Sequence, residues 1–110
     1  MSDNINELII EDIEVGSGDE CPSGATVEVH YKGTLIDGTV FDSSYDRGES
    51  INFPLGNLIQ GWQEGIPGMK VGGKRKLSIP YMKAYGPQGI PGAIPPKSDL
   101  VFEIELLGVS

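Results

Sequence analysis

Side chains that carry out covalent or metal chemistry are scarce in this chain of 110 residues. His30 is its single histidine and Cys21 its single cysteine. A zinc site needs several such ligands, and a serine or cysteine nucleophile needs a base beside it. His30 stands within an alternating strand pattern, so we interpret it as a sheet residue. Cys21 has no cation nearby in sequence to activate its thiol, and we expect it to be inert.

Two segments resemble ion-binding loops but lack a required residue. Gly68–Arg75 contains the glycines and lysine of a phosphate loop, yet Arg75 stands where Ser or Thr would hold Mg²⁺, and a strand pattern follows it. Asp42–Gly48 is similar to the start of a calcium loop, yet Arg47 occupies the sixth position, where glycine is needed. The sequence therefore predicts neither a metal site nor a cofactor.

Six aromatic residues remain as candidates for a binding site: Tyr31, Phe41, Phe53, Trp62, Tyr85 and Phe102. Most of them fall on the apolar positions of expected strands or of an expected helix, so ordinary core packing would account for any one of them. A lone tryptophan on a helix beneath a sheet could equally form the floor of an apolar pocket. Both interpretations of Trp62 stay open at this level.

The charge distribution argues against a nucleic-acid partner. The formal net charge is −8, and residues 1–29 hold eight acidic side chains and neither lysine nor arginine. Such a chain is a poor nucleic-acid binder, because binding requires cations that neutralise phosphates. One cysteine favours a reducing compartment, and no signal segment or membrane-length apolar run is present. We expect a cytoplasmic monomer with no nucleic-acid or membrane partner.

Hydrophobic periodicity predicts one α+β domain over residues 8–110, with a frayed N-terminus at residues 1–7. Alternating segments predict strands at residues 8–15, 26–32, 39–42, 51–55, 77–79 and 100–107. Asn57 is expected to cap one short helix of about two to three turns that ends near Gly65. Residues 43–50 and 80–96 are expected to be loops. The half-polar strands imply an antiparallel sheet of five or six strands, with its apolar face covered by the helix.

Seven segments follow one another with characteristic spacing: Val29–Leu35, Asp37–Ser44, Gly61–Gly65, Gly72–Leu77, Ala84–Gly86, Ile94–Pro96 and Leu100–Leu107. Together they closely resemble the signature of FKBP-type peptidyl-prolyl cis–trans isomerases of the single-domain, cytosolic, macrolide-binding type. The resemblance covers roughly residues 8–109. It implies an antiparallel half-barrel sheet wrapped around one short helix, and an enzyme that rotates X–Pro bonds without a cofactor or metal.

The resemblance also implies a binding pocket between the sheet and the helix. The positions that match its catalytic residues are Tyr31, Asp42, Tyr85 and Phe102. Those that match substrate- and macrolide-binding residues are Phe41, Arg47, Ile51, Phe53, Leu58, Ile59, Trp62, Ile90 and Ile94. By this resemblance Trp62 forms the floor, the Ile59 N–H and the Tyr85 hydroxyl bind substrate carbonyls, and Arg47 pairs with Asp42.

The implied partners are proline-containing polypeptides and macrolides such as rapamycin and tacrolimus. Asp42 either orients Arg47 and Tyr31 or polarises the rotating carbonyl. Two other functions stay open. The same pocket would serve a module that holds proline-containing segments without turnover, or a helper that acts on unfolded chains.

Overall fold

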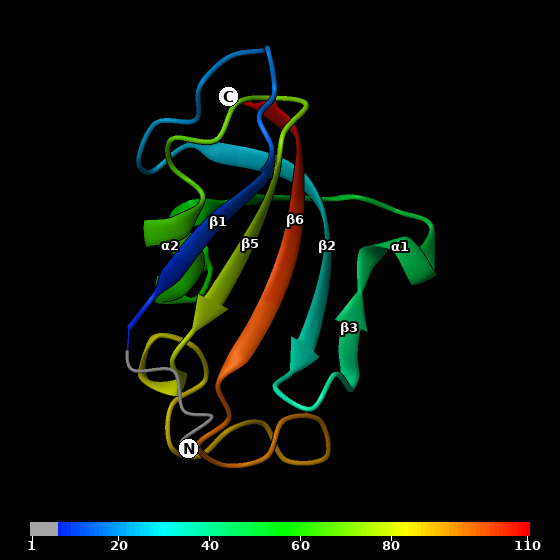
Figure 1. Ribbon diagram of the computed structural model, residues 1–110, viewed down its shortest axis with the longest axis vertical. Coiled ribbons are helices and arrows are strands. Elements are labelled where there is room, and N and C mark those ends of the chain that lie inside the picture. Colours follow the sequence, from blue (N-terminus) through cyan, green and yellow to red (C-terminus); the bar gives the residue numbers. More distant parts are fainter. Residues whose placement is uncertain (1–6) are drawn as a thin grey trace.

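The computed structural model describes residues 7–110, and residues 1–6 of the expected frayed N-terminus lie outside the described part. Across residues 7–110, six strands form one antiparallel sheet (Figure 1). They are β1 (Ile9–Glu14), β2 (Thr26–Leu35), β3 (Val40–Ser43), β4 (Ile51–Pro54), β5 (Lys74–Ile79) and β6 (Leu100–Val109). The strand order is β1-β5-β6-β2-β3, and β4 pairs with the first part of β2.

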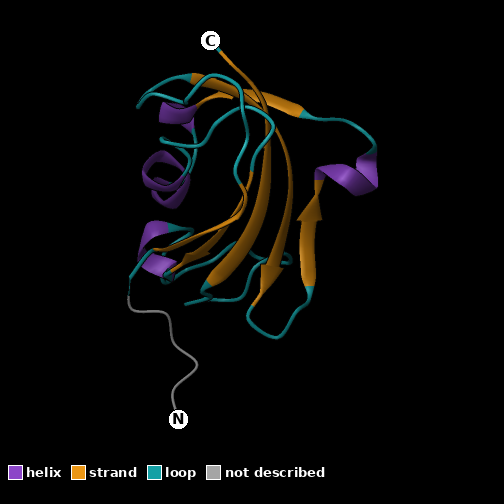
Figure 2. Cartoon of the chain, turned by 45° about the horizontal axis from the view of Figure 1, so that its top comes forward, coloured by secondary structure: helices purple, strands orange, loops and turns teal. Residues whose placement is uncertain are grey.

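Short helical segments complete the fold of the described chain. They are α1 (Ser44–Arg47), α2 (Gln60–Gly65) and the 3₁₀ turns η1 (Leu55–Asn57) and η2 (Tyr81–Lys83). The sheet curves around the side that holds α2, whereas α1 lies on the opposite side next to β3 (Figure 2). This arrangement confirms the predicted α+β half-barrel. No helix within residues 7–110 is long and apolar enough to cross a membrane.

The core lies between the inner face of the sheet and α2, where the alternation predicted it. Three long strands turn every second side chain inward: Val27, Val29 and Tyr31 from β2; Leu77 and Ile79 from β5; Leu100, Phe102, Ile104 and Leu106 from β6. Trp62 and Ile66 of the α2 region pack against them and are also buried. Burying these apolar surfaces is the main source of stability in such a domain.

Helix α2 is shorter than the sequence pattern suggested and begins two residues later than expected from an Asn57 cap. Asn57 belongs to η1, and Leu58 and Ile59 have extended backbones with ψ of 171° and 154°. Ile59 therefore stands at the helix N-cap, where no side chain caps the helix. The apolar spacing of Leu58 and Ile59 indicated a helix, but these side chains face the interior from extended backbone.

Strand β1 was predicted correctly as a strand, but every one of its residues is exposed. Asp12 pairs in register with Arg75 of β5, and its carboxylate accepts a hydrogen bond of 2.7 Å from Arg75 Nε. Because this pair takes the inward position, Ile13 faces the opposite side and is 54% exposed. The buried Arg75 guanidinium also donates to the carbonyls of Gly65 and Pro67, at 2.9 and 3.3 Å, and so holds the end of α2 against the sheet.

The segment 43–50, expected to be a loop, contains the single-turn helix α1. The Ser43 hydroxyl accepts a hydrogen bond from the N–H of Asp46, which caps the turn at its start. Gly48 ends it with a φ of 72°, a left-handed conformation that glycine adopts without strain. This turn places Arg47 beside Asp42.

Candidate active site

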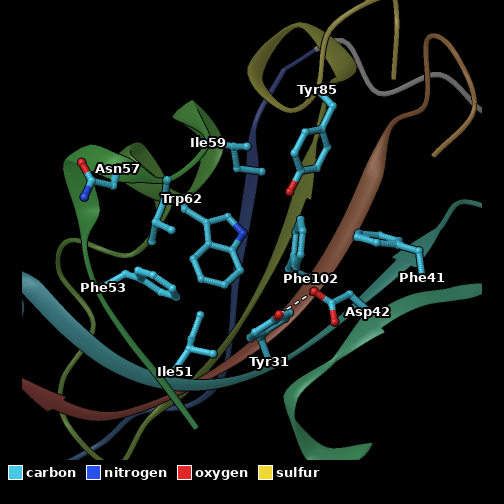
Figure 3. Close-up of a pocket in the computed structure, with 11 residues that line it drawn as sticks. Tyr31, Phe41, Asp42, Ile51, Phe53, Asn57, Ile59, Trp62, Tyr85 and Phe102 are labelled. Carbon is cyan, nitrogen blue, oxygen red and sulfur yellow. Dashed lines mark hydrogen bonds between the residues drawn. The ribbon is translucent and has the colours of Figure 1, made fainter. Parts of the chain in front are cut away.

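A cavity of about 250 Å³ opens between the sheet and the segment that leads into α2 (Figure 3). Its walls are mostly aromatic and aliphatic. The lining residues are Tyr31, Phe41, Asp42, Ile51, Phe53, Asn57, Leu58, Ile59, Trp62, Tyr85 and Phe102. They come from β2, β3, β4, η1, α2 and β6, from residues 58–59 between η1 and α2, and from the long connection before β6. The site therefore exists only after the sheet has closed over the helix.

The Trp62 ring meets two other rings nearly at right angles at the base of the cavity. The centroids of Trp62 and Phe102 are 5.1 Å apart with an interplanar angle of 88°, and those of Trp62 and Tyr31 are 5.3 Å apart at 76°. Edge-to-face packing of this kind is favourable beyond the area that it buries. The buried Trp62 Nε1 has no hydrogen-bond acceptor among residues 7–110. The base is thus a closely packed, mostly apolar surface that carries one unpartnered N–H group.

Two glycines make this packing possible. A side chain at Gly33 of β2 would lie 2.6 Å from the Phe41 ring and 2.8 Å from the Phe102 ring. A side chain at Gly61 of α2 would lie 2.6 Å from Ile79 of β5. The missing Cβ atoms let the aromatic rings approach β2, and let the helix that carries Trp62 approach the sheet.

One wall of the cavity is polar, and its side chains are hydrogen-bonded to one another. The Tyr31 hydroxyl donates to Asp42 Oδ2 at 2.5 Å and accepts from Arg47 Nη2 at 2.9 Å. Arg47 Nη1 donates to the other oxygen of Asp42 and forms an ion pair with it. The Arg47 guanidinium carbon also lies 5.7 Å from the centroid of the Tyr31 ring. The three side chains therefore hold one another at the edge of the apolar base.

The electrostatics of this wall keep both tyrosines protonated and the aspartate charged. Burial raises the pKa of Tyr31, and its hydrogen bond to Asp42 raises it further. Burial alone would raise the pKa of Asp42, but the hydrogen bonds from Tyr31 and Arg47 outweigh it, so that pKa lies below its usual value. Burial, and then the charge of Asp42, raise the pKa of Tyr85.

The Ile59 N–H and the Tyr85 hydroxyl are hydrogen-bond donors of the lining that are free to bind a ligand. Neither the backbone N–H of Ile59 nor the hydroxyl of Tyr85 has a hydrogen-bond partner within residues 7–110. The Tyr85 hydroxyl points into the cavity from above Phe102 (Figure 3). A carbonyl-bearing ligand of the cavity would satisfy both donors.

The structure brings most of the residues named from the sequence into this one cavity. Arg47 lies just outside the lining and acts on it through Asp42 and Tyr31. Ile90 and Ile94 pair with each other through their backbones in the 80–99 connection, outside the lining. Their contact with a ligand stays a prediction. Asn57 was not predicted, because its place before the apolar residues resembled a helix cap.

The two reactive side chains considered first lie away from the cavity. His30 Nδ1 is 2.9 Å from Ser44 Oγ, and its ring stacks on Tyr45 on the outer side of the sheet. Cys21 is buried, which raises the pKa of its thiol. These positions agree with the interpretation of His30 as a sheet residue and of Cys21 as an inert thiol.

The fold is an antiparallel sheet curved over a short helix, with an aromatic cavity between them. Comparison with known proteins identifies the family that has this architecture. Residues 18–107 match the family model described as FKBP-type peptidyl-prolyl cis-trans isomerase. The chain belongs to this family.

Individual relatives support this assignment. The chain is 50% identical over 107 residues to a protein of Neisseria meningitidis serogroup A named FK506-binding protein, with 96% of this chain and 98% of the relative covered. It is 53% identical over 102 residues to the isomerase FkpA of Escherichia coli K12, covering 93% of this chain but only 37% of FkpA. The crystal structure of E. coli FkpA superposes with a TM-score of 0.88 at 51% identity, covering 94% of this chain and 48% of that one.

Proposed function

We propose that the protein accelerates cis–trans rotation of X–Pro bonds in polypeptides, with the proline ring bound over Trp62. The observation that carries this proposal is the combination of an aromatic base with two unpartnered donors, the Ile59 N–H and the Tyr85 hydroxyl. An extended proline-containing segment offers one apolar ring and flanking carbonyls. The cavity offers the complementary groups.

Rotation about an X–Pro bond needs no bond to break. The barrier of about 18–20 kcal/mol arises from loss of amide resonance as the bond twists. The planar imide is more polar than the twisted one, so a water-poor aromatic surface disfavours the planar state relative to the twisted state. Fixed donors at the cavity rim favour the rotated carbonyl. Each tenfold acceleration requires about 1.4 kcal/mol of such differential binding.

The polar wall has one of two roles in this proposal. The Asp42 carboxylate either holds Tyr31 and Arg47 in place or acts on the rotating carbonyl directly. Its carboxylate oxygens already accept hydrogen bonds from Tyr31 and Arg47, which supports the orienting role. In both cases a charged Asp42 is needed at neutral pH.

A protease-free isomerisation assay on a peptide with Leu or Phe before proline tests the proposal. We expect acceleration by the wild-type protein and a loss of about tenfold in kcat/KM for Tyr85→Phe, which removes one donor. Tyr81→Phe is the matched control, because Tyr81 lies four residues away, in η2, and does not line the cavity. An inactive wild-type protein, or equal losses in both variants, would contradict the proposal.

Macrolide binding, a monomeric state and a cytoplasmic location are finer proposals. The cavity that would hold a proline ring would also hold the apolar ring of rapamycin or tacrolimus, and excess drug should then abolish the acceleration and quench Trp62 fluorescence. Quenching without any acceleration would favour a module that binds proline-containing segments without turnover. Sedimentation tests the monomeric state and cell fractionation tests the location. The free Cys21 thiol, which suits a reducing compartment, supports the proposed location.

A further inference from the structure

A buried serine outside the cavity connects the strand that carries Tyr31 to the turn that carries Asp42 and Arg47. The Ser44 side chain has no exposed surface. Its Oγ lies 2.7 Å from the N–H nitrogen of Tyr31, 3.2 Å from the carbonyl oxygen of Tyr31 and 2.9 Å from His30 Nδ1. These contacts involve the backbone of Tyr31 and the ring of His30, whereas the Tyr31 hydroxyl is held by Asp42 and Arg47.

The three contacts define where the protons lie. A serine hydroxyl has one proton to donate and two lone pairs that accept. The Tyr31 carbonyl can only accept, so it takes the Ser44 proton, and the Tyr31 N–H donates to one lone pair. His30 then donates through a proton on Nδ1 to the second lone pair. The hydroxyl is fully satisfied in this arrangement.

Ser44 replaces a missing strand partner. On one side of β2, residues 26–29 pair with β4 and residues 32–34 pair with β3. His30 and Tyr31 fall between these two partners and pair with neither of them. Both backbone hydrogen-bonding groups of Tyr31 on this side are instead taken by the Ser44 hydroxyl. Unpartnered buried backbone groups are costly, so this side chain closes a gap in the sheet.

The same short segment binds Tyr31 at both ends. Ser44 holds its backbone, while Asp42 and Arg47 hold its hydroxyl. Outside the sheet, His30 stacks on Tyr45, and the Tyr45 hydroxyl donates to Glu105 at 3.0 Å, which supports the turn from behind. Residues 42–47 therefore contact Tyr31 at both its backbone and its hydroxyl, and Ser44 is the buried residue of this segment that binds the backbone.

We propose that Ser44 is a positioning residue, which places the Asp42–Arg47 pair on the Tyr31 hydroxyl and so builds the polar wall of the cavity. Only the expected effect of Ser44 on the isomerisation rate rests on the proposed function. The structural consequence, the alignment of Asp42, can be measured without any substrate.

The test compares Ser44→Ala with Ser78→Ala, which removes another buried hydroxyl from the same sheet, on β5 and outside the cavity lining. We expect Ser44→Ala to lower kcat/KM about tenfold in the isomerisation assay, mainly through kcat, and Ser78→Ala to change it less than about twofold. In a Tyr31→Phe background, Ser44→Ala should cause less than about a twofold further loss, because the group it positions is gone. Equal losses in both backgrounds would overturn the proposal and assign Ser44 a general structural role.

A second measurement separates this inference from the proposed function. NMR titration of the Asp42 carboxyl should show its pKa rising in Ser44→Ala and unchanged in Ser78→Ala, whether or not the wild type is active. An unchanged Asp42 titration in Ser44→Ala would overturn the positioning role, and an inactive wild type would overturn only the isomerase function. If Ser44→Ala does not fold, Ser44→Cys keeps a weaker hydrogen-bonding group at the same position and should show the same direction of change.

Discussion

The hydroxyl of Tyr31 and the carboxylate of Asp42 meet at 2.5 Å where the aromatic base of the cavity gives way to its polar wall. Tyr31 belongs to the buried centre of β2, whereas Asp42 lies on β3 at the margin of the sheet. The bond therefore joins a buried strand of the sheet to β3, which lies at the end of the strand order. Arg47 completes the set by donating to both residues.

Acid should weaken this set and lower the stability of the fold. The folded-state pKa of Asp42 is depressed, so its contribution to stability is present above its unfolded pKa of about 3.9 and is lost as pH falls through the folded value. Since the carboxylate is 40% exposed, we expect a contribution below about 1 kcal/mol. Urea unfolding at about pH 6 and about pH 2.5 should show a smaller pH dependence for Asp42→Asn than for the wild type. Identical pH dependence would contradict the assignment.

Replacing Gly61 with alanine should push α2 away from the sheet. The new Cβ would lie 2.6 Å from two side-chain carbons of Ile79, whose backbone is held by pairing with Leu100 of β6. We expect a loss of about 1–3 kcal/mol in unfolding free energy, together with a changed Trp62 fluorescence spectrum. Gly56→Ala is the control, because a Cβ there meets no atom within 4 Å, and it should leave both quantities unchanged.

Removing the buried guanidinium of Arg75 should loosen the end of α2. Arg75→Met would leave the carbonyls of Gly65 and Pro67 without this donor and Asp12 without its partner. We expect a destabilisation of about 2–4 kcal/mol by chemical denaturation, since charged hydrogen bonds to buried acceptors are lost. Lys76→Met removes an exposed cation 3.9 Å from Glu11 and should cost less than about 1 kcal/mol. Similar losses in the two variants would show that the Arg75 contacts to α2 contribute little.

The Cys21 thiol should react slowly while the protein is folded. Its side chain is buried, and burial raises its pKa, so little thiolate is available to attack a reagent. A disulfide reagent such as DTNB should label it only in unfolded molecules, so urea should speed labelling in proportion to the unfolded fraction. Rapid labelling in the absence of urea would contradict the described environment.

The sequence alone determined which side chains face the core along the long strands. Alternation in 26–32 and 100–107 placed Val29, Tyr31 and Phe102 inside, because a strand turns successive side chains to opposite faces whatever its partners are. The turn at Asp37 and Gly38 was equally local, since the Asp37 carboxylate accepts the Thr39 N–H at 2.9 Å and Gly38 has a φ of 93°. The resemblance of ordered motifs then predicted the family and nearly all of the cavity lining.

Only the tertiary structure decided features that depend on contacts between distant segments. The inward side of β1 belongs to Asp12 rather than Ile13 because a buried arginine 63 residues away requires a carboxylate. Leu58 and Ile59 have helical spacing, yet they are extended so that α2 can meet the sheet at Gly61. Ser44 has no periodic signal at all. Its role arises where β3 and β4 leave Tyr31 without a strand partner, and no local pattern records such a gap.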